Sequence, residues 1–296
     1  MGRLLSFMIK PPFFSKNKPF SYIIFLLSID NKHKSYKIIV VKPIVLLSIY
    51  NLITLSIVTV LLIMCKNVIR KDSTKDKILK YVSIAVVIIH YSALYYDFFA
   101  EKGDVDLGDS FLFPIYPCHI VMWMLVAVAF IKNRNTVFYK SLAEFTFLVG
   151  TVCGLVGVLY NFNFLDDPYF TDYWSLKGLL SHTVMIFGTI FIGVMGYVKI
   201  RVPNTMRSLF WGLVFFASWG GLMNFMFRAT GIDEELNAMY MMEPPIPALP
   251  FLNFFVLGGI GLLLAFAGLL IFEKFALPVE ERWLTKVEKE RENKYV

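Results

Sequence analysis

The sequence predicts an all-α membrane protein, a polytopic bundle of seven transmembrane helices. Hydrophobic residues make up 57% of the 296 residues and the mean hydropathy is +0.63, whereas a soluble domain contains roughly 45 to 50% apolar residues. A helix needs about 20 apolar residues to cross some 30 Å of hydrocarbon. Such windows lie near residues 43–65, 78–100, 111–131, 139–160, 178–198, 208–227 and 251–272. The chain therefore divides into an N-terminal arm (1–42), a membrane domain (43–272) and a charged tail (273–296).

The charges between the windows predict how the chain faces. Lys and Arg dominate the loops at 66–77, 132–140 and 199–207, which the positive-inside rule places in the cytoplasm. The alternate loops are acidic and contain Glu101, Asp104, Asp106, Asp109, Asp166, Asp167, Asp172, Asp233, Glu234, Glu235 and Glu243. Seven spans then predict a cell-membrane protein with its C-terminal tail in the cytoplasm.

The N-terminal arm disagrees with this orientation. It is basic, with residues such as Arg3, Lys10 and Lys42 on the side where positive charge is disfavoured. Its apolar piece, YIIFLLSI, is too short to cross the bilayer, and the small-residue cleavage site of a signal peptide is missing. Either the arm lies on the membrane surface or the start codon is misassigned. The three internal basic loops agree with one another and decide the orientation.

The fourth and fifth windows contain glycines at close-packing spacing, in GTVCGLVG (150–157) and GTIFIGVMG (188–196). Small residues let helix backbones approach each other in lipid, and helix packing alone explains these glycines. The fourth window also contains Glu144. This carboxylate lies about one turn from a basic loop, where it can snorkel to the surface or meet a partner.

Polar residues gather near the outer ends of the spans. Cys118 and His119 lie about seven residues, or roughly 10 Å, below the outer end of the third span, and His182 lies roughly 6 Å below that of the fifth. Polar groups at or beyond other outer ends are Asp97, Asn161, Asn163, Asn224, Asn237 and Tyr240. Such groups are costly in lipid unless they face the bundle interior or a wet cavity. Interfacial placement explains many of them, but Cys118 and His182 at one depth predict a functional pocket that opens outward.

The third span opens with two prolines, in FPIYPCHIVMW. Proline is tolerated in the first turn of a helix, so this stretch predicts a helix that begins near Pro117, with residues 114–116 as a bent lead-in. Cys118 then lies in the first turn, where the helix dipole favours a thiolate. The free N–H groups of Cys118 and His119 are expected to point as an oxyanion hole requires.

The proton acceptor for Cys118 is expected on another helix. His119 is adjacent in sequence, but neighbouring helical residues do not face each other. His182 shares its helix face with Gly178, Met185 and Thr189. It can serve Cys118 if the third and fifth spans touch.

Three motifs, in their order along the chain, resemble a known family. They are PIYPCHI in the third span, SHTVMIFGTI in the fifth and NAMYMMEPP before the seventh. Over roughly residues 45–272 the chain resembles the YwaF-like bacterial integral membrane proteins, relatives of the animal transmembrane acyltransferases that remodel ether phospholipids. More distant relatives are membrane hydrolases of fatty acid esters of hydroxy fatty acids, which use Thr in place of Cys. The resemblance implies Cys118 as the nucleophile and His182 as the catalytic histidine; Tyr116 stands where bacterial members often have a histidine.

The sequence thus predicts a membrane acyltransferase or ester hydrolase that acts on a phospholipid or another acyl lipid. The Cys118 thiolate would form an acyl thioester and His182 would transfer the protons. The expected substrate contacts are Tyr116, His119, Asn224, Asn237 and Tyr240. The three cysteines lack the spacing of a zinc site or a disulfide framework, so no metal or cofactor is expected. The net charge of +7 lies in juxtamembrane loops, which disfavours a nucleic-acid partner.

Two other functions fit parts of the same pattern. A non-enzymatic transporter or receptor would bind a small ligand in the outward pocket, independently of the thiol. A haem protein would use His90, His119 and His182, but His90 is expected near mid-bilayer, well below His182.

Overall fold

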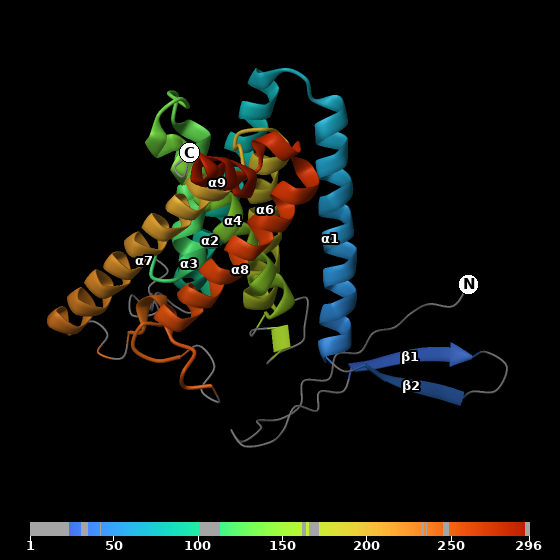
Figure 1. The fold of residues 1–296 in the computed structure, drawn as a ribbon. Coiled ribbons are helices and arrows are strands. Elements are labelled where there is room, and N and C mark those ends of the chain that lie inside the picture. The colour runs from blue at the N-terminus through green and yellow to red at the C-terminus, as the bar shows by residue number, and fades with distance from the viewer. Residues whose placement is uncertain are drawn as a thin grey trace.

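The computed structural model describes residues 24–30, 35–41, 43–100, 113–161, 164–165, 172–231, 234, 236–244 and 249–293. Within these residues, seven apolar helices form the membrane domain (Figure 1): α1 (Pro43–Val68), α2 (Asp72–Ala100), α3 (Pro117–Phe130), α4 (Val137–Leu159), α6 (Tyr173–Val194), α7 (Val202–Thr230) and α8 (Phe254–Ala276). Six are long and apolar enough to cross a membrane, and α3 is a shorter apolar helix. The predicted all-α bundle is confirmed.

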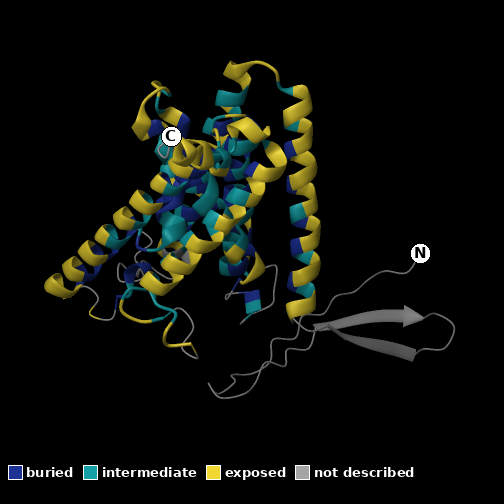
Figure 2. Cartoon of the chain, in the orientation of Figure 1, coloured by how far each residue is buried: buried dark blue, intermediate teal, exposed yellow. Residues whose placement is uncertain are grey.

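Helices α2, α3, α4 and α6 form a ring at the centre of the bundle. Within it, α6 contacts α2 and α4, and α3 contacts the same two helices. Fully buried side chains such as Leu125, Ile186 and Phe191 fill the core. Outside the ring, α1 packs on α6, α7 on α4 and α8 on α7. The outer faces of these three helices are largely exposed and apolar (Figure 2), as expected of surfaces that face lipid.

Helix α3 begins at Pro117, as the sequence predicts. Pro117 occupies the first helical position and Tyr116 is an extended N-cap. The 14 residues of α3 span about 21 Å at 1.5 Å per residue, less than the hydrocarbon thickness. Non-helical backbone at membrane depth is tolerated only where protein covers it. Ile115, in the lead-in, is indeed only 2% exposed.

The three basic loops meet at one end of the bundle. Arg134, between α3 and α4, forms an ion pair with Asp76 of α2 at 2.8 Å. Tyr197, which follows α6, donates a hydrogen bond to the same Asp76 carboxylate at 2.7 Å, and the Arg134 guanidinium lies 4.8 Å from the Tyr197 ring centre. The loops therefore face the same side, as expected. Which compartment that side faces stays a prediction.

Glu144 has a partner between α4 and α7. The hydroxyl of Ser208 donates to its carboxylate at 2.8 Å, and both residues are buried. This partner replaces the snorkelling that the sequence also allowed, because Glu144 faces α7 rather than the membrane surface.

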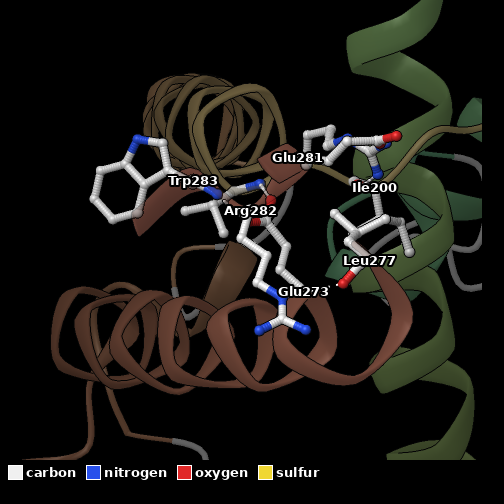
Figure 3. A network of polar contacts seen from close by, with 8 residues as sticks. Ile200, Glu273, Leu277, Glu281, Arg282 and Trp283 are labelled. Carbon is white, nitrogen blue, oxygen red and sulfur yellow. Dashed lines mark hydrogen bonds and ion pairs between the residues drawn. The ribbon is translucent and has the colours of Figure 1, made fainter. Parts of the chain in front are cut away.

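The C-terminal tail is folded rather than loose. Helix α8 continues past residue 272 to Ala276, followed by η2 (Val279–Glu281) and α9 (Trp283–Glu292). The Glu273 carboxylate is 2% exposed and accepts the backbone N–H groups of Val202 at 2.9 Å and Trp283 at 2.7 Å (Figure 3). It thereby caps the first turns of both α7 and α9. The expected start of the tail at residue 273 thus falls inside α8.

The N-terminal arm contains two strands that the sequence analysis does not predict. They are β1 (Ile24–Asp30) and β2 (Ser35–Val41), which pair antiparallel with Ile24 opposite Val41. Most of the apolar piece that is too short to cross the bilayer lies in β1. Residues 1–23 are outside the described part of the chain.

Candidate active site

A cavity of about 140 Å³ lies between α2, α3 and α6. Cys118 and His119 of α3, His182 of α6 and His90 of α2 all line it. The two residues expected to be catalytic therefore face one space, on helices that meet across it. A cavity of this volume accommodates a few waters or a small polar group such as an ester, since one water needs about 10 to 15 Å³ of cavity volume.

Cys118 lies in the first turn of α3, as expected from the prolines. The residue as a whole is half-buried, and its thiol is not part of a disulfide. The N–H groups of Cys118 and His119 were both expected to be free to form an oxyanion hole. For His119 this expectation is wrong, because its N–H already donates to the carbonyl of Tyr116 at 3.0 Å. A helix that starts at Pro117 makes this bond in closing its first turn.

The ring of His182 has a defined orientation. Its Nδ1 lies 2.7 Å from the carbonyl oxygen of Gly178, one turn earlier in α6. A carbonyl can only accept, so Nδ1 carries the proton and Nε2 of the neutral ring keeps a free lone pair. On its other side the ring packs on Gly157 of α4, where an added Cβ would overlap Cδ2 and Nε2. The arrangement suits a general base that works through Nε2.

Cys118 and His182 face the same cavity without a hydrogen bond between them among the described residues. Such bonds are often long before a substrate binds and tighten only in the reacting complex. The cavity that both groups line has room for a water or for a small polar group.

His90 lies at the level of the cavity, so the expectation that it lies well below His182 is wrong. Its ring centre is 4.4 Å from that of His119, and His90, His119 and His182 line the same cavity. Its expected depth near mid-bilayer stays a prediction.

Three imidazoles therefore line the cavity. Among the described residues, no three His, Cys, Asp or Glu side chains are arranged to hold a metal ion. The haem alternative stays a prediction.

Aromatic residues surround the start of α3. The Tyr116 ring lies 5.4 Å from that of His119 and 5.3 Å from that of Tyr240, onto which it stacks. Burial raises the pKa of Tyr240, and the nearby Cys118 and Tyr116 raise it further, so its phenol keeps its proton at neutral pH. His119 lines the cavity itself, and its Nδ1 is buried without a hydrogen-bond partner among the described residues.

Two expected substrate contacts are instead engaged in structural hydrogen bonds. The Asn224 side chain bonds both backbone groups of Ala238, accepting at 2.7 Å and donating at 3.3 Å. Asn237 closes its own loop by accepting from Met242 N–H and donating to the Glu243 carbonyl, both at 2.9 Å. Their contacts with substrate stay predictions, as do those of Tyr116, His119 and Tyr240. Asn163 and the side chain of Asp97 lie outside the described residues.

Sequence reasoning missed several residues of the cavity. Trp174 and Lys177 line it on α6, with the Lys177 ammonium 5.4 Å from the Trp174 ring centre. The spacing of three and four residues from Trp174 through Lys177 to Ser181, the neighbour of His182, was the available signal, because it places these lining residues on one helix face. Gly157 was assigned to helix packing, but its close neighbour is the His182 ring.

Comparison with known proteins gives a match over most of the chain. A family model described as the TMEM164 family matches residues 39–272, which include every residue that lines the cavity. No curated protein and no solved structure matches the chain. The expected kinship with YwaF-like proteins and with acyltransferases stays a prediction. The matched region contains the membrane helices and the cavity together, and the chain belongs to the TMEM164 family of multi-pass membrane proteins.

Proposed function

We propose that the protein is a membrane enzyme that moves the acyl chain of a lipid ester through a thioester on Cys118. The observation that carries the proposal is that Cys118 and His182 line one cavity inside the helix ring. The substrate would be a phospholipid or another acyl lipid, which reaches the cavity from the surrounding membrane. With the basic loops in the cytoplasm, the reaction would take place in the outer leaflet of the cell membrane.

In the first half of the reaction, the Cys118 sulfur attacks the ester carbonyl carbon. His182 Nε2 takes the thiol proton, and its Nδ1–H stays bonded to Gly178. The carbon–sulfur bond forms, the carbon–oxygen bond breaks, and the leaving alkoxide takes the proton from the imidazolium. The products of this half are a thioester on Cys118 and a deacylated lipid.

In the second half, an acceptor hydroxyl takes the place of the departed alcohol. His182 Nε2 removes its proton, the oxygen attacks the thioester carbon, and the thiolate leaves and is reprotonated. A lysolipid as acceptor makes the enzyme a transferase, and water makes it a hydrolase.

The neighbouring polar groups suit supporting roles. Tyr240, whose ring stacks on that of Tyr116 two residues before Cys118, would donate to the carbonyl oxygen, on which negative charge develops during attack. The unpaired Nδ1 of His119 is a partner for a polar group of the substrate in the cavity.

The test is to trap the intermediate. Purified protein is incubated with a phospholipid that carries a labelled acyl chain, and Cys118 is examined by mass spectrometry. We expect an acyl adduct on Cys118 that Cys118→Ala abolishes, and turnover lowered at least about 100-fold by His182→Ala. Cys65→Ala is the matched control, because Cys65 is another half-buried free thiol but lies on α1 and does not line the cavity.

The opposite outcome is equally concrete. If Cys118 stays unmodified and turnover survives both Cys118→Ala and His182→Ala, the proposal is wrong. Ligand binding or flux that persists without the thiol would instead indicate a transporter or receptor.

A further inference from the structure

We infer that Asn224 is a positioning residue for Cys118. Its side-chain amide holds the backbone of Ala238, and the N–H of the next residue, Met239, holds the lead-in to α3. The inference rests on the proposed role of Cys118 as the nucleophile.

The lead-in depends on other segments for its hydrogen bonds. The carbonyl of Pro114 accepts from Trp219 Nε1 of α7 at 2.7 Å, and the carbonyl of Ile115 accepts from the N–H of Met239 at 3.0 Å. Buried backbone carbonyls without partners would be costly at this depth. These two bonds are what fix the non-helical residues immediately before Cys118.

The donor of the second bond lies in strained backbone. Met239 and Tyr240, in η1 (Ala238–Tyr240), have φ angles of 56° and 55°. Residues with side chains rarely adopt this left-handed conformation, which costs about 1 to 3 kcal/mol each and persists only when the surroundings enforce it. A specific restraint on η1 is therefore needed.

Asn224 supplies that restraint. It is 5% exposed, and its amide engages both the N–H and the carbonyl of Ala238, the residue directly before Met239. Gly220, one turn earlier in α7, lets η1 approach closely, since a Cβ there would overlap the Met239 side chain. A continuous path of hydrogen bonds thus runs from Asn224 through Ala238 and Met239 to Ile115.

The two catalytic groups are consequently fixed by separate contacts. His182 is held by Gly178 and Gly157, whereas Cys118, three residues after Ile115, is held through the path from Asn224. Loss of the Asn224 amide would shift Cys118 while His182 stays in place. A misplacement of about 1 Å in such a pair costs about 100-fold in rate.

The experiment compares Asn224→Leu and Asn224→Asp with Ser208→Ala, all in a chain that carries Cys65→Ala and Cys153→Ala. Asn224→Asp keeps the acceptor for Ala238 N–H and removes the donor, so the fold survives more readily than with Leu. Ser208 is the matched control because it lies on the same helix, is 4% exposed and also makes a buried side-chain hydrogen bond. The readouts are thioester formation with the labelled phospholipid and the pH profile of Cys118 alkylation by N-ethylmaleimide.

We expect thioester formation about 100-fold slower in Asn224→Leu and about 10-fold slower in Asn224→Asp, with a displaced pH profile of alkylation in both. Ser208→Ala should stay within about twofold of the parent in both readouts. Parent-like acylation and alkylation in both Asn224 variants would overturn the inference and leave the proposed function intact. If the parent forms no thioester, the proposed function fails, and a parent-like alkylation profile in Asn224→Asp would still refute the positioning role.

Discussion

The ring of His182 is held on two sides, and both contacts bear on its chemistry. The Gly178 carbonyl selects the tautomer by accepting from Nδ1, and Gly157 leaves just enough space for the Nε2 edge. A histidine without these neighbours could rotate or present the wrong nitrogen to a thiol. At the residue scale, two glycines therefore fix the orientation of the His182 ring and its tautomer.

Gly157→Ala tests this arrangement. The new methyl group would overlap the His182 ring, so the ring must swing away and give up its bond to Gly178. We expect thioester formation to fall by about 100-fold, measured with the labelled phospholipid.

Gly221→Ala is the control for Gly157→Ala, because Gly221 lies within α7 and an added Cβ there meets nothing within 4 Å. Alanine at such a helical position stabilises by about 0.5 to 1 kcal/mol and should leave the rate unchanged. Equal rates in the two variants would show that Gly157 does not position the ring.

Single residues also show what the sequence can and cannot predict. The depths of Cys118 and His182 along their spans were enough to predict that both line one cavity, because the rise per residue of a helix converts residue number into height. The same reasoning failed for His90, which was expected well below His182 but lines the same cavity. The bonds of Asn224 were beyond prediction, since they join its amide to backbone groups rather than to any recognisable side chain.

At the scale of elements, the start of α3 is dictated locally but stabilised from afar. Two prolines are enough to predict Pro117 as the first helical residue. The hydrogen bond from Trp219 to Pro114 joins residues 105 positions apart in the sequence, and no local sequence pattern predicts such a partner. The strands β1 and β2 were missed for a different reason: a short apolar run fits a strand or a helix equally well.

The Asp76 carboxylate links elements at the opposite end of the bundle. It accepts from Arg134 and Tyr197, and so joins α2 to the loop before α4 and to the loop after α6. Burial and the bond to Asp76 raise the pKa of Tyr197 above the ordinary value of a tyrosine. The folded protein thus keeps this proton at a pH where the unfolded chain loses it.

Tyr197→Phe is predicted to change stability in a pH-dependent way. Because the folded pKa is raised, the contribution of Tyr197 is complete below about pH 10 and is lost as the pH rises further. The variant should lose about 1 to 2 kcal/mol of unfolding free energy at neutral pH and show a smaller decline above pH 10. The measurement is thermal unfolding in detergent at neutral pH and at a pH above 10.

The control for Tyr197→Phe is Tyr81→Phe, because Tyr81 lies on α2 and is 71% exposed. It should leave unfolding close to that of the parent at neutral pH. A Tyr197→Phe protein with the parental stability and the parental decline at high pH would contradict the role of this bond.

At the scale of the whole molecule, the last helices are attached by few contacts. Only Leu269 and Glu273 of α8 are buried, and α8 packs mainly on α7. The attachment of α8 and α9 to α7 therefore depends strongly on the Glu273 carboxylate, because its two oxygens cap α7 and α9 at once. An anion there also complements the positive ends of both helix dipoles.

Glu273→Gln should therefore loosen the tail while leaving the cavity intact. The amide keeps one acceptor oxygen but turns an NH₂ group toward the second backbone N–H, so one cap is lost at a cost of about 1 to 2 kcal/mol. We expect faster tryptic cleavage around Arg282 and an unchanged rate of Cys118 alkylation, because Cys118 lies near the other end of the bundle.

The matched control is Glu280→Gln, which changes an exposed residue of η2. Equal cleavage in both variants would mean that α9 is held by its other contacts, such as the packing of the Trp283 ring on Phe266 of α8. Slower alkylation in Glu273→Gln alone would mean that the two ends of the bundle are coupled rather than stabilised separately.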